Sequence, residues 1–351
     1  MNLFFKILET SVYTKVDTTI SEPTATLITP STSDFAYTVY DLPGITSGYR
    51  RRSAFSVLQI NTNATEIAVK AFVQWTATIS TMMSIYDENW NFITTVHGDS
   101  TSEGFSTRTA TLTGSGFRRF YIVEGGIGKE NNIEPKGQWI STIEAVTGTI
   151  EITLIPKNTN RIVAVGDSIL VGAVSSLNSR YGWIPLLRGV KRAQDWSVST
   201  YGFGSASTMD MFLTDEYQQV GAQDVFDNLT GATGRKVLIW VLGTNDFNYG
   251  KDPNDMAIAA GNVWDKVYAL DSTIEIICVT PLLRGDNSRL TGIGDWSIID
   301  HRNALTTAAN SRAYVTVYDG EPIIASADLV DQVHPNDVGH QKVADYMASI
   351  L

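Results

Sequence analysis

The chain has 351 residues, of which 43% are hydrophobic and 18% are charged, and it carries a formal net charge of −11 at pH 7. This composition is typical of a globular protein, and the length favours two domains over one. The negative charge argues against nucleic acid and anionic membranes as partners, and no window approaches the ~20 uninterrupted apolar residues of a membrane span.

Two features of the sequence bear on the cellular compartment of the protein: its first residues and its single cysteine. Neither of them determines the compartment. The first eight residues, MNLFFKIL, are too few for a secretory signal peptide, so none is expected in this chain. We leave the localisation open and suspect an extracellular or virion-associated protein. Cys278 lies in an apolar run and is predicted to pack in the core. One cysteine excludes an internal disulfide and a cysteine-rich metal site.

Residues 1–156 are predicted to form an all-β, jelly-roll-like sandwich domain. Short runs rich in Thr, Val, Ile and aromatic residues alternate with turn-forming segments such as 61–63 and 114–116. Many short strands at near-regular spacing favour an antiparallel sandwich. The predicted strands are 54–60, 67–75, 82–86, 92–96, 118–123, 139–145 and 149–155.

The pattern changes at the polar segment 156–160, so a second domain is predicted for residues 157–351. Apolar, strand-like runs now alternate with helical spacing, which indicates a parallel sheet with helices on both faces. The predicted strands are 162–165, 196–201, 236–242, 274–280 and 315–318, and the predicted helices are 181–188, 209–228, 256–270, 298–312 and 338–351.

Ser168 stands at the end of the first strand of this second domain. The stretch after it, Ile169-Leu170-Val171, is expected to open a helix whose N–H groups would favour negative charge beside Ser168. The plainer alternative is a turn in which Ser168 only caps that helix. The ends of parallel strands are where open α/β sheets place reactive groups.

Acyl transfer from an ester needs a set of residue types that this chain carries at strand ends. Ser168 is a candidate nucleophile, His334 the base that takes its proton, and Asp331 the carboxylate that orients the imidazole. The oxyanion needs fixed N–H donors, which the Asn245 side chain and the glycine turn 202–204 can supply. These donors and the Ser168 N–H form the predicted oxyanion hole.

Four motifs in this order resemble the SGNH, or GDSL-like, hydrolases, a family of esterases and lipases. The motifs are Gly166-Asp167-Ser168, the glycine turn 202–204, Gly243-Thr244-Asn245-Asp246 and Asp331-x-x-His334-Pro335-Asn336. The resemblance implies a flavodoxin-like, three-layer α/β/α fold, a Ser-His-Asp triad and an oxyanion hole from Ser168, Gly204 and Asn245.

The second motif departs from the family pattern, in which Asn often precedes the glycine turn and a further Gly follows it. Thr200 and Ser205 stand near those positions here. We therefore expect Gly204 to supply the backbone donor, with Gly202 and Ser205 as alternatives.

A β-sandwich before such a domain resembles the two-domain acetyl-esterases that act on carbohydrates. The resemblance implies hydrolysis of short O-acyl esters, above all O-acetyl, on a carbohydrate or polysaccharide partner. Two alternatives stay open: a lipase or thioesterase with the same triad, and a non-catalytic glycan-binding protein of a phage or cell surface. We expect no cofactor and no catalytic metal, because the four histidines lack metal-ligand spacing. The sequence does not fix the oligomeric state.

The remaining polar and aromatic residues receive simpler interpretations. Arg284 and Trp296, in the Gly-rich segment after strand 274–280, are predicted substrate contacts. Asp167 and Asp246 are expected to stabilise their own turn and loop. His340 is expected to pack or cap its helix. The other interpretations are structural or solvated roles for His97 and His301, a solvated patch at 50–52 that could instead meet an acidic glycan, and core packing of Trp75, Trp90 and Trp139 with a sugar platform as the alternative.

Overall fold

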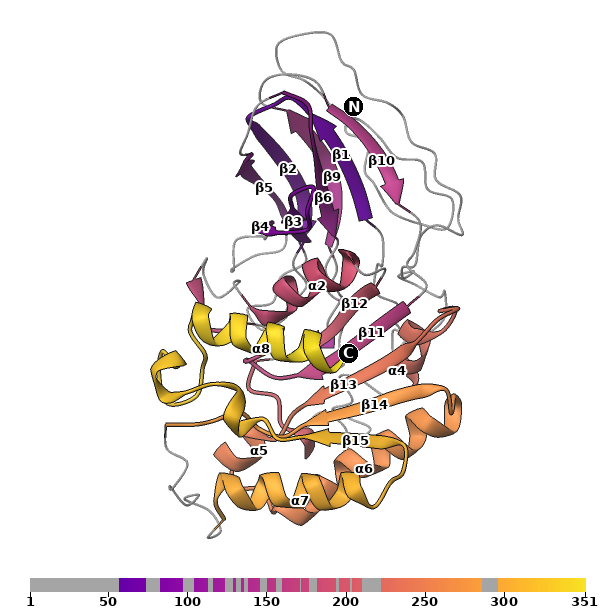
Figure 1. Cartoon of the computed structure of the whole chain (residues 1–351), viewed down its shortest axis with the longest axis vertical. Helices are drawn as coiled ribbons and strands as arrows, with labels where there is room; N and C mark the ends of the chain where they lie inside the picture. The colour runs from indigo at the N-terminus through magenta and orange to yellow at the C-terminus, as the bar shows by residue number, and fades with distance from the viewer. Residues whose placement is uncertain are drawn as a thin grey trace.

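The computed structural model comprises a β-rich first part and an α/β second part (Figure 1). The boundary predicted between residues 156 and 157 lies outside the described residues and stays a prediction. The structure describes residues 57–73, 83–96, 104–112, 116–123, 129–130, 134–135, 138–145, 150–155, 160–170, 172–176, 182–193, 196–202, 204–209, 222–285 and 296–351.

The first part contains antiparallel sheets, with strands at each of the seven predicted positions. Strand β5, Gly104–Thr111, was not predicted, because its sequence GFSTRTAT has no apolar run. One sheet has the order β10-β1-β6-β3-β4, and a second has the order β5-β2-β9. That these sheets face one another as a jelly-roll-like sandwich stays a prediction. The bounds are β1 Val57–Thr62, β2 Glu66–Val73, β3 Met83–Tyr86, β4 Phe92–Val96, β6 Arg118–Val123, β7 Lys129–Glu130, β8 Glu134–Pro135, β9 Gln138–Ala145 and β10 Ile150–Ile155.

The second part is built on a five-stranded parallel sheet of order β12-β11-β13-β14-β15. Counted from its own first strand, the order is 2-1-3-4-5, the flavodoxin-like doubly wound arrangement. The prediction of a parallel α/β sheet is therefore confirmed. The bounds are β11 Asn160–Gly166, β12 Trp196–Gly202, β13 Lys236–Val241, β14 Ile274–Val279 and β15 Val315–Tyr318.

Helices cover both faces of this sheet, giving three layers (Figure 1). Alternate side chains of β11 show the division: Ile162 and Ala164 pack with α2 and α8, whereas Val163 and Val165 pack with α4, α6 and α7. Among the described residues, no helix is long and apolar enough to cross a membrane. The bounds are α2 Trp183–Ala193, α4 Ala222–Leu229, α5 Thr244–Asn248, α6 Pro253–Leu270, α7 Ile298–Asn310 and α8 Asp337–Ile350.

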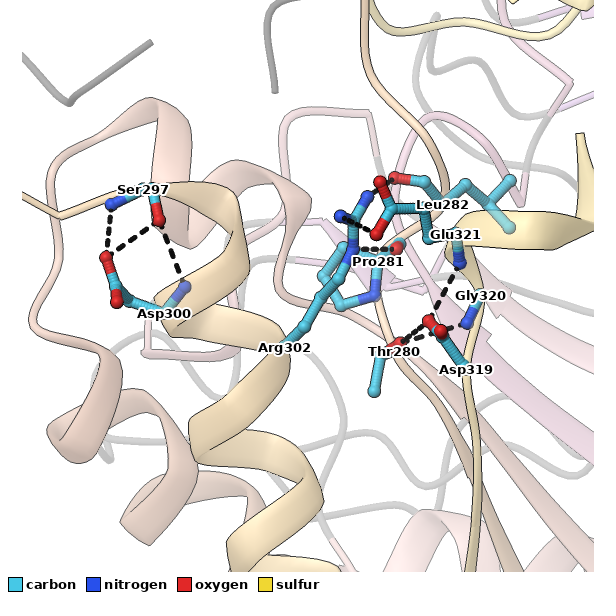
Figure 2. A network of polar contacts seen from close by, with 9 residues as sticks. All are labelled: Thr280, Pro281, Leu282, Ser297, Asp300, Arg302, Asp319, Gly320 and Glu321. Carbon is cyan, nitrogen blue, oxygen red and sulfur yellow. Dashed lines mark hydrogen bonds and ion pairs between the residues drawn. The ribbon is translucent and has the colours of Figure 1, made fainter. Parts of the chain in front are cut away.

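Helix ends follow local capping chemistry. Helix α6 begins at Pro253 rather than at 256, because Asp252 caps it by accepting the Asn254 N–H. Helix α7 begins with a capping box, in which Ser297 and Asp300 satisfy one another's backbone N–H groups (Figure 2). Of the helix predicted at 209–228, the structure describes α4 at its end, and residues 210–221 lie outside the described set.

The hairpin β3–β4 of the first part contacts helix α2 of the second part. The Tyr86 hydroxyl donates to the Pro185 carbonyl at 2.7 Å, and Trp90 stacks on Tyr121 with a 4.1 Å centroid distance. Gly189 on α2 lies against the Trp90 carbonyl so closely that a Cβ has no room, and the Tyr86 ring would lie 3.2 Å away. The close approach of the hairpin to the helix therefore requires glycine at position 189.

Replacing Gly189 with Ala tests this contact. Ala in a helix interior ordinarily stabilises by ~1 kcal/mol over Gly. Here the new methyl group meets backbone, so we expect the variant to lose about 1–3 kcal/mol of unfolding free energy, measured by urea denaturation. Gly261→Ala in α6 is the comparison variant, because the nearest atoms to its Cβ belong to the guanidinium of Arg312 and none of them is backbone. A stabilised Gly189→Ala variant would contradict the observed docking.

Candidate active site

The turn after β11 is shaped by a glycine and a buried carboxyl group. At Gly166 a Cβ would lie 2.6 Å from the Val241 side chain, so only glycine fits. Asp167 is fully buried, and its Oδ1 accepts the Ile169 N–H at 2.9 Å. This bond bends the chain so that Ser168 is partly exposed at the end of the strand.

The helix expected directly after Ser168 is absent from the described part of this segment. Residues 168–170 and 172–174 form turns, in which Ala173 N–H donates to the Ser168 carbonyl. Gly172 and Val174 have φ angles of 74° and 65°, which a right-handed helix excludes. The prediction that a helix begins directly after Ser168 was therefore wrong.

Ser168, His334 and Asp331 form a continuous hydrogen-bonded row. Ser168 Oγ lies 3.0 Å from His334 Nε2, although the two residues are far apart in the chain. His334 Nδ1 lies 2.8 Å from Asp331 Oδ2, and Asp331 Oδ1 accepts the N–H groups of Val333 and His334 at 2.7 Å each. Burial raises the pKa of Asp331, but the bonds from His334 and the backbone outweigh it, so that the pKa falls below its ordinary value. The ionised carboxylate holds the imidazole and its loop together.

The loop that carries His334 is closed by backbone bonds on both sides. Val330 N–H donates to the His334 carbonyl at 2.9 Å, and Leu329 pairs with Pro335 in an antiparallel bridge. Asn336 then caps α8 by accepting the Gly339 N–H. The imidazole thus projects from a tight turn directly before a helix.

Asn245 lies in the short helix α5, directly after β13. Gly243 before it has a φ angle of 125°, a conformation that glycine readily adopts. The Asn245 amide is almost buried: its Oδ1 accepts from Asn248 at 3.1 Å, and its Nδ2 donates to the Ala206 carbonyl at 3.0 Å. Asp167 Oδ2 lies 3.4 Å from the same nitrogen. These contacts fix the orientation of the amide, and its NH₂ group faces the turn that carries Asp167 and Ser168.

The turn 204–209, which follows β12, is fastened by residues of the α5 segment. Asp246 is fully buried and accepts the N–H groups of Thr208 at 2.8 Å and Met209 at 3.3 Å. The Tyr249 hydroxyl donates to the Ser205 carbonyl at 3.1 Å. We expected Asp246 to organise its own loop; it organises the neighbouring turn instead. No sequence signal near Asp246 indicated these partners, since they lie almost forty residues away.

The glycines predicted as oxyanion donors occupy different positions. Gly202 is the last residue of β12, where it pairs with Gly166 of β11. Gly204 lies beyond the strand in the turn, before Ser205, whose φ angle is 63°. The preference for Gly204 over Gly202 or Ser205 as the donor stays a prediction.

Burial changes the acidity of the two internal carboxyl groups. Desolvation raises the pKa of Asp167 to about 7, with a further increase from the nearby Asp246 charge and a partial offset by the Ile169 N–H and Arg284. Desolvation likewise raises the pKa of Asp246, against its bonds from Thr208 and Met209. Both groups therefore resist ionisation more than a surface aspartate does.

Arg284 and Trp296 lie in different surroundings. Arg284 is 3% exposed, and its guanidinium lies 4.8 Å from the centre of the Phe247 ring, in the same interior as Asp167. Trp296 is half-buried and lines a groove of about 630 Å³ between α6 and α7, whose lining residues include neither Ser168 nor His334. Their roles as substrate contacts stay predictions.

Arg302 of α7 fixes the segment that follows β14 (Figure 2). Its guanidinium donates to the carbonyls of Pro281 at 2.8 Å and Leu282 at 2.6 Å, and pairs with Glu321 at 2.8 Å. The same segment reaches the histidine loop through the Gly285 N–H, which donates to the Gln332 carbonyl. Sequence reasoning missed Arg302, because its partners come from distant segments.

The remaining cysteine and histidines that the structure describes are buried. Cys278 is buried in the core, which raises the pKa of its thiol. His301 is buried between the carbonyls of Ser297 and Lys251, and burial lowers the pKa of His340 to about 4. Within the described residues, no cluster of His, Cys, Asp or Glu could hold a metal ion. His97, residues 50–52, Trp75 and the Trp139 side chain lie outside the described set.

The arrangement of a serine, a histidine and an amide donor at the sheet edge agrees with the comparison to known families. The sequence profile of the GDSL-like lipase/acylhydrolase family matches residues 164–342, about half of the chain. The chain belongs to this family. It is accordingly an esterase of the SGNH type, and the predicted family resemblance is confirmed. No curated protein sequence matches this GDSL-like hydrolase.

Solved structures share the fold of this GDSL-like hydrolase at low sequence identity. A salicylyl-acyltransferase from a tetracycline biosynthetic pathway is 15% identical, with a TM-score of 0.56 over 84% of this chain and 82% of its own. A family two carbohydrate esterase from Clostridium thermocellum, in complex with cellohexaose, is 14% identical, with a TM-score of 0.55 over 87% and 91%. An acetyl xylan esterase from the rumen bacterium Butyrivibrio proteoclasticus is 11% identical, with a TM-score of 0.54 over 87% and 89%. These alignments extend beyond the family match.

The role of Asp246 in holding the 204–209 turn of the hydrolase can be tested by two substitutions. Asp246→Ala leaves the buried N–H groups of Thr208 and Met209 without their acceptor, so we expect a loss of about 1–3 kcal/mol in unfolding free energy. Asp246→Asn keeps one acceptor oxygen and is expected to lose less. Urea denaturation measures both, and equal losses would contradict the hydrogen-bonding role.

Proposed function

We propose that this GDSL-like hydrolase removes short O-acyl groups, above all O-acetyl, from a carbohydrate, using Ser168, His334 and Asp331. The observation that carries the proposal is the row of contacts from Ser168 Oγ to His334 Nε2 at 3.0 Å and from His334 Nδ1 to Asp331 Oδ2 at 2.8 Å. A nucleophile, a base and an orienting carboxylate in hydrogen-bond reach are what acyl transfer through a serine requires.

The reaction follows from this row in two halves. Ser168 Oγ attacks the ester carbonyl carbon while its proton passes to His334 Nε2. The tetrahedral intermediate collapses, the bond to the sugar oxygen breaks, and His334 returns the proton to that oxygen. Water then attacks the acyl-serine with His334 again as base, which releases the carboxylic acid and restores Ser168. Asp331 keeps Nδ1 protonated, so that Nε2 is free to accept.

The oxyanion of each tetrahedral intermediate would be held by the N–H of Ser168, the N–H of Gly204 and the Asn245 amide. Support comes from the fixed Asn245 amide, whose Nδ2 already donates one hydrogen to Ala206 and directs the other toward the Asp167–Ser168 turn. Such preorganised donors cost no reorganisation during the reaction, and removing one typically slows an enzyme by ~10²–10³.

The carbohydrate assignment is supported by solved structures of the same fold, among them a carbohydrate esterase in complex with cellohexaose and an acetyl xylan esterase. At 11–14% identity these proteins share the architecture of this chain, and an assay identifies the ester. The two alternatives, a lipase or thioesterase and a non-catalytic glycan-binding protein, predict different outcomes in the same assay.

A panel of esters tests the proposed activity directly. We expect the purified protein to hydrolyse p-nitrophenyl acetate and acetylated xylan, to act poorly on p-nitrophenyl octanoate, and to lose at least ~10³-fold in kcat in the Ser168→Ala variant. Spectrophotometry and acetate release measure these rates. A preference for octanoate would overturn the deacetylase assignment, and hydrolysis independent of Ser168 would overturn the mechanism.

The contributions of the base and its partner can be separated. We expect His334→Ala to reduce kcat more than Asp331→Asn, because the asparagine still accepts the loop N–H groups while the imidazole stays beside Ser168. Steady-state kinetics on p-nitrophenyl acetate measures both variants. Equal losses would mean that the carboxylate charge is as necessary as the base, and a smaller loss for His334→Ala would remove His334 from the mechanism.

A further inference from the structure

The orientation of the Asn245 amide depends on three neighbours, one of which is a carboxyl group. Asn248 donates to Asn245 Oδ1 at 3.1 Å, which sets the amide oxygen on one side. On the other side, one N–H donates to the Ala206 carbonyl at 3.0 Å. The nitrogen also lies 3.4 Å from Asp167 Oδ2, longer than a strong hydrogen bond. The second N–H of Asn245 therefore points toward Asp167, the residue before Ser168, and makes only a long contact with it.

The position of Asp167 is fixed by its own burial and by a backbone hydrogen bond. It is fully buried, and its Oδ1 already accepts the Ile169 N–H, so Oδ2 is the oxygen that faces Asn245. The charged groups that act on it are Asp246 of α5 and Arg284 of the segment after β14. Burial, the largest effect, raises the pKa of Asp167 to about 7. Both its neutral and its ionised forms are thus accessible near neutral pH.

We propose that Asp167 is a positioning residue of the oxyanion hole, which aims the second N–H of Asn245 and, through its own charge state, sets how freely that N–H is given to the oxyanion. The proposal rests on the proposed function, since it assigns a role to Asp167 in the same acyl transfer. It adds a residue that neither nucleophilic nor acid–base chemistry uses.

The two charge states of Asp167 have opposite effects on an oxyanion at Ser168. The neutral carboxyl group competes weakly for the Asn245 N–H, so that the donor is available in the transition state. The ionised carboxylate attracts the N–H more strongly and repels a second negative charge one residue away. The catalytic form therefore holds Asp167 neutral, and kcat should fall as the pH rises through the Asp167 titration.

The experiment compares pH profiles of kcat on p-nitrophenyl acetate for the wild type, Asp167→Asn, Asp167→Ala and Asp255→Asn. Asparagine is neutral at every pH and keeps an oxygen for the Ile169 N–H. We expect the ratio of kcat in Asp167→Asn to kcat in the wild type to increase at least ~10-fold between pH 6 and pH 9, and Asp167→Ala to show the same increase. Asp255 is exposed in the first turn of α6, so Asp255→Asn controls for the loss of one negative charge.

A ratio that stays flat with pH in both Asp167 variants would overturn the proposal, and so would an equal increase in Asp255→Asn. The effect should fall on kcat rather than on KM, because the oxyanion exists only in the transition state and intermediates. Loss of activity in Ser168→Ala together with a flat ratio would reject this inference alone, whereas full activity in Ser168→Ala would reject the proposed function.

Unfolding measurements separate positioning from folding. A pKa raised by burial contributes stability that is present below pH 3.8 and is lost as the pH rises toward about 7, since the folded state must then hold a buried charge. We therefore expect Asp167→Asn to be at least as stable as the wild type at pH 9 in urea denaturation. An unstable Asp167→Asn variant at pH 9 would contradict the buried, neutral carboxyl group on which the proposal depends.

Discussion

The site depends on the cost of burying two carboxyl groups at one edge of a parallel sheet. A buried carboxyl group must be given hydrogen-bond donors or stay protonated. Asp167 takes the Ile169 N–H and faces the Asn245 amide, while Asp246 takes two N–H groups of the turn 204–209. The turns after β11, β12 and β13 are therefore joined to one another by buried hydrogen bonds, which hold Ser168 and Asn245 in fixed relative positions.

His334 is held by a separate set of contacts. Arg302 fixes the carbonyls of the segment after β14 (Figure 2). The Gly285 N–H of that segment donates to the Gln332 carbonyl in the histidine loop. Asp331 closes the loop from inside by accepting two of its N–H groups. Ser168 and His334 thus come from independently supported elements that meet at a hydrogen bond, which is the preorganisation that the proposed acyl transfer needs.

The β-rich first part contacts the second part at helix α2. Its hairpin β3–β4 lies against Gly189 of α2, and α2 packs on α8, the helix that follows the histidine loop (Figure 1). Such a contact joins the first part to the layer that supports His334. The solved structures of the same fold align over 84–87% of this chain, which is more than its second part alone.

The sequence by itself predicted most of the strands and helices and singled out the candidate site residues. Apolar runs placed β11 and β13, and the polar motifs after them singled out Ser168 and Asn245 as candidates, because the edge of a parallel sheet gathers the ends of its strands. His334 was singled out by its motif just before the final helix. The apolar pattern after Ser168 predicted a helix that the structure does not contain. Gly172 and Val174 have positive φ angles there, so the segment forms turns instead. Only the tertiary structure showed which residues these side chains contact. Asp246 supports a turn almost forty residues away, Arg302 supports the segment after β14, and Asp167 faces Asn245. Burial and long-range hydrogen bonds have no local sequence pattern, so the sequence alone does not predict them.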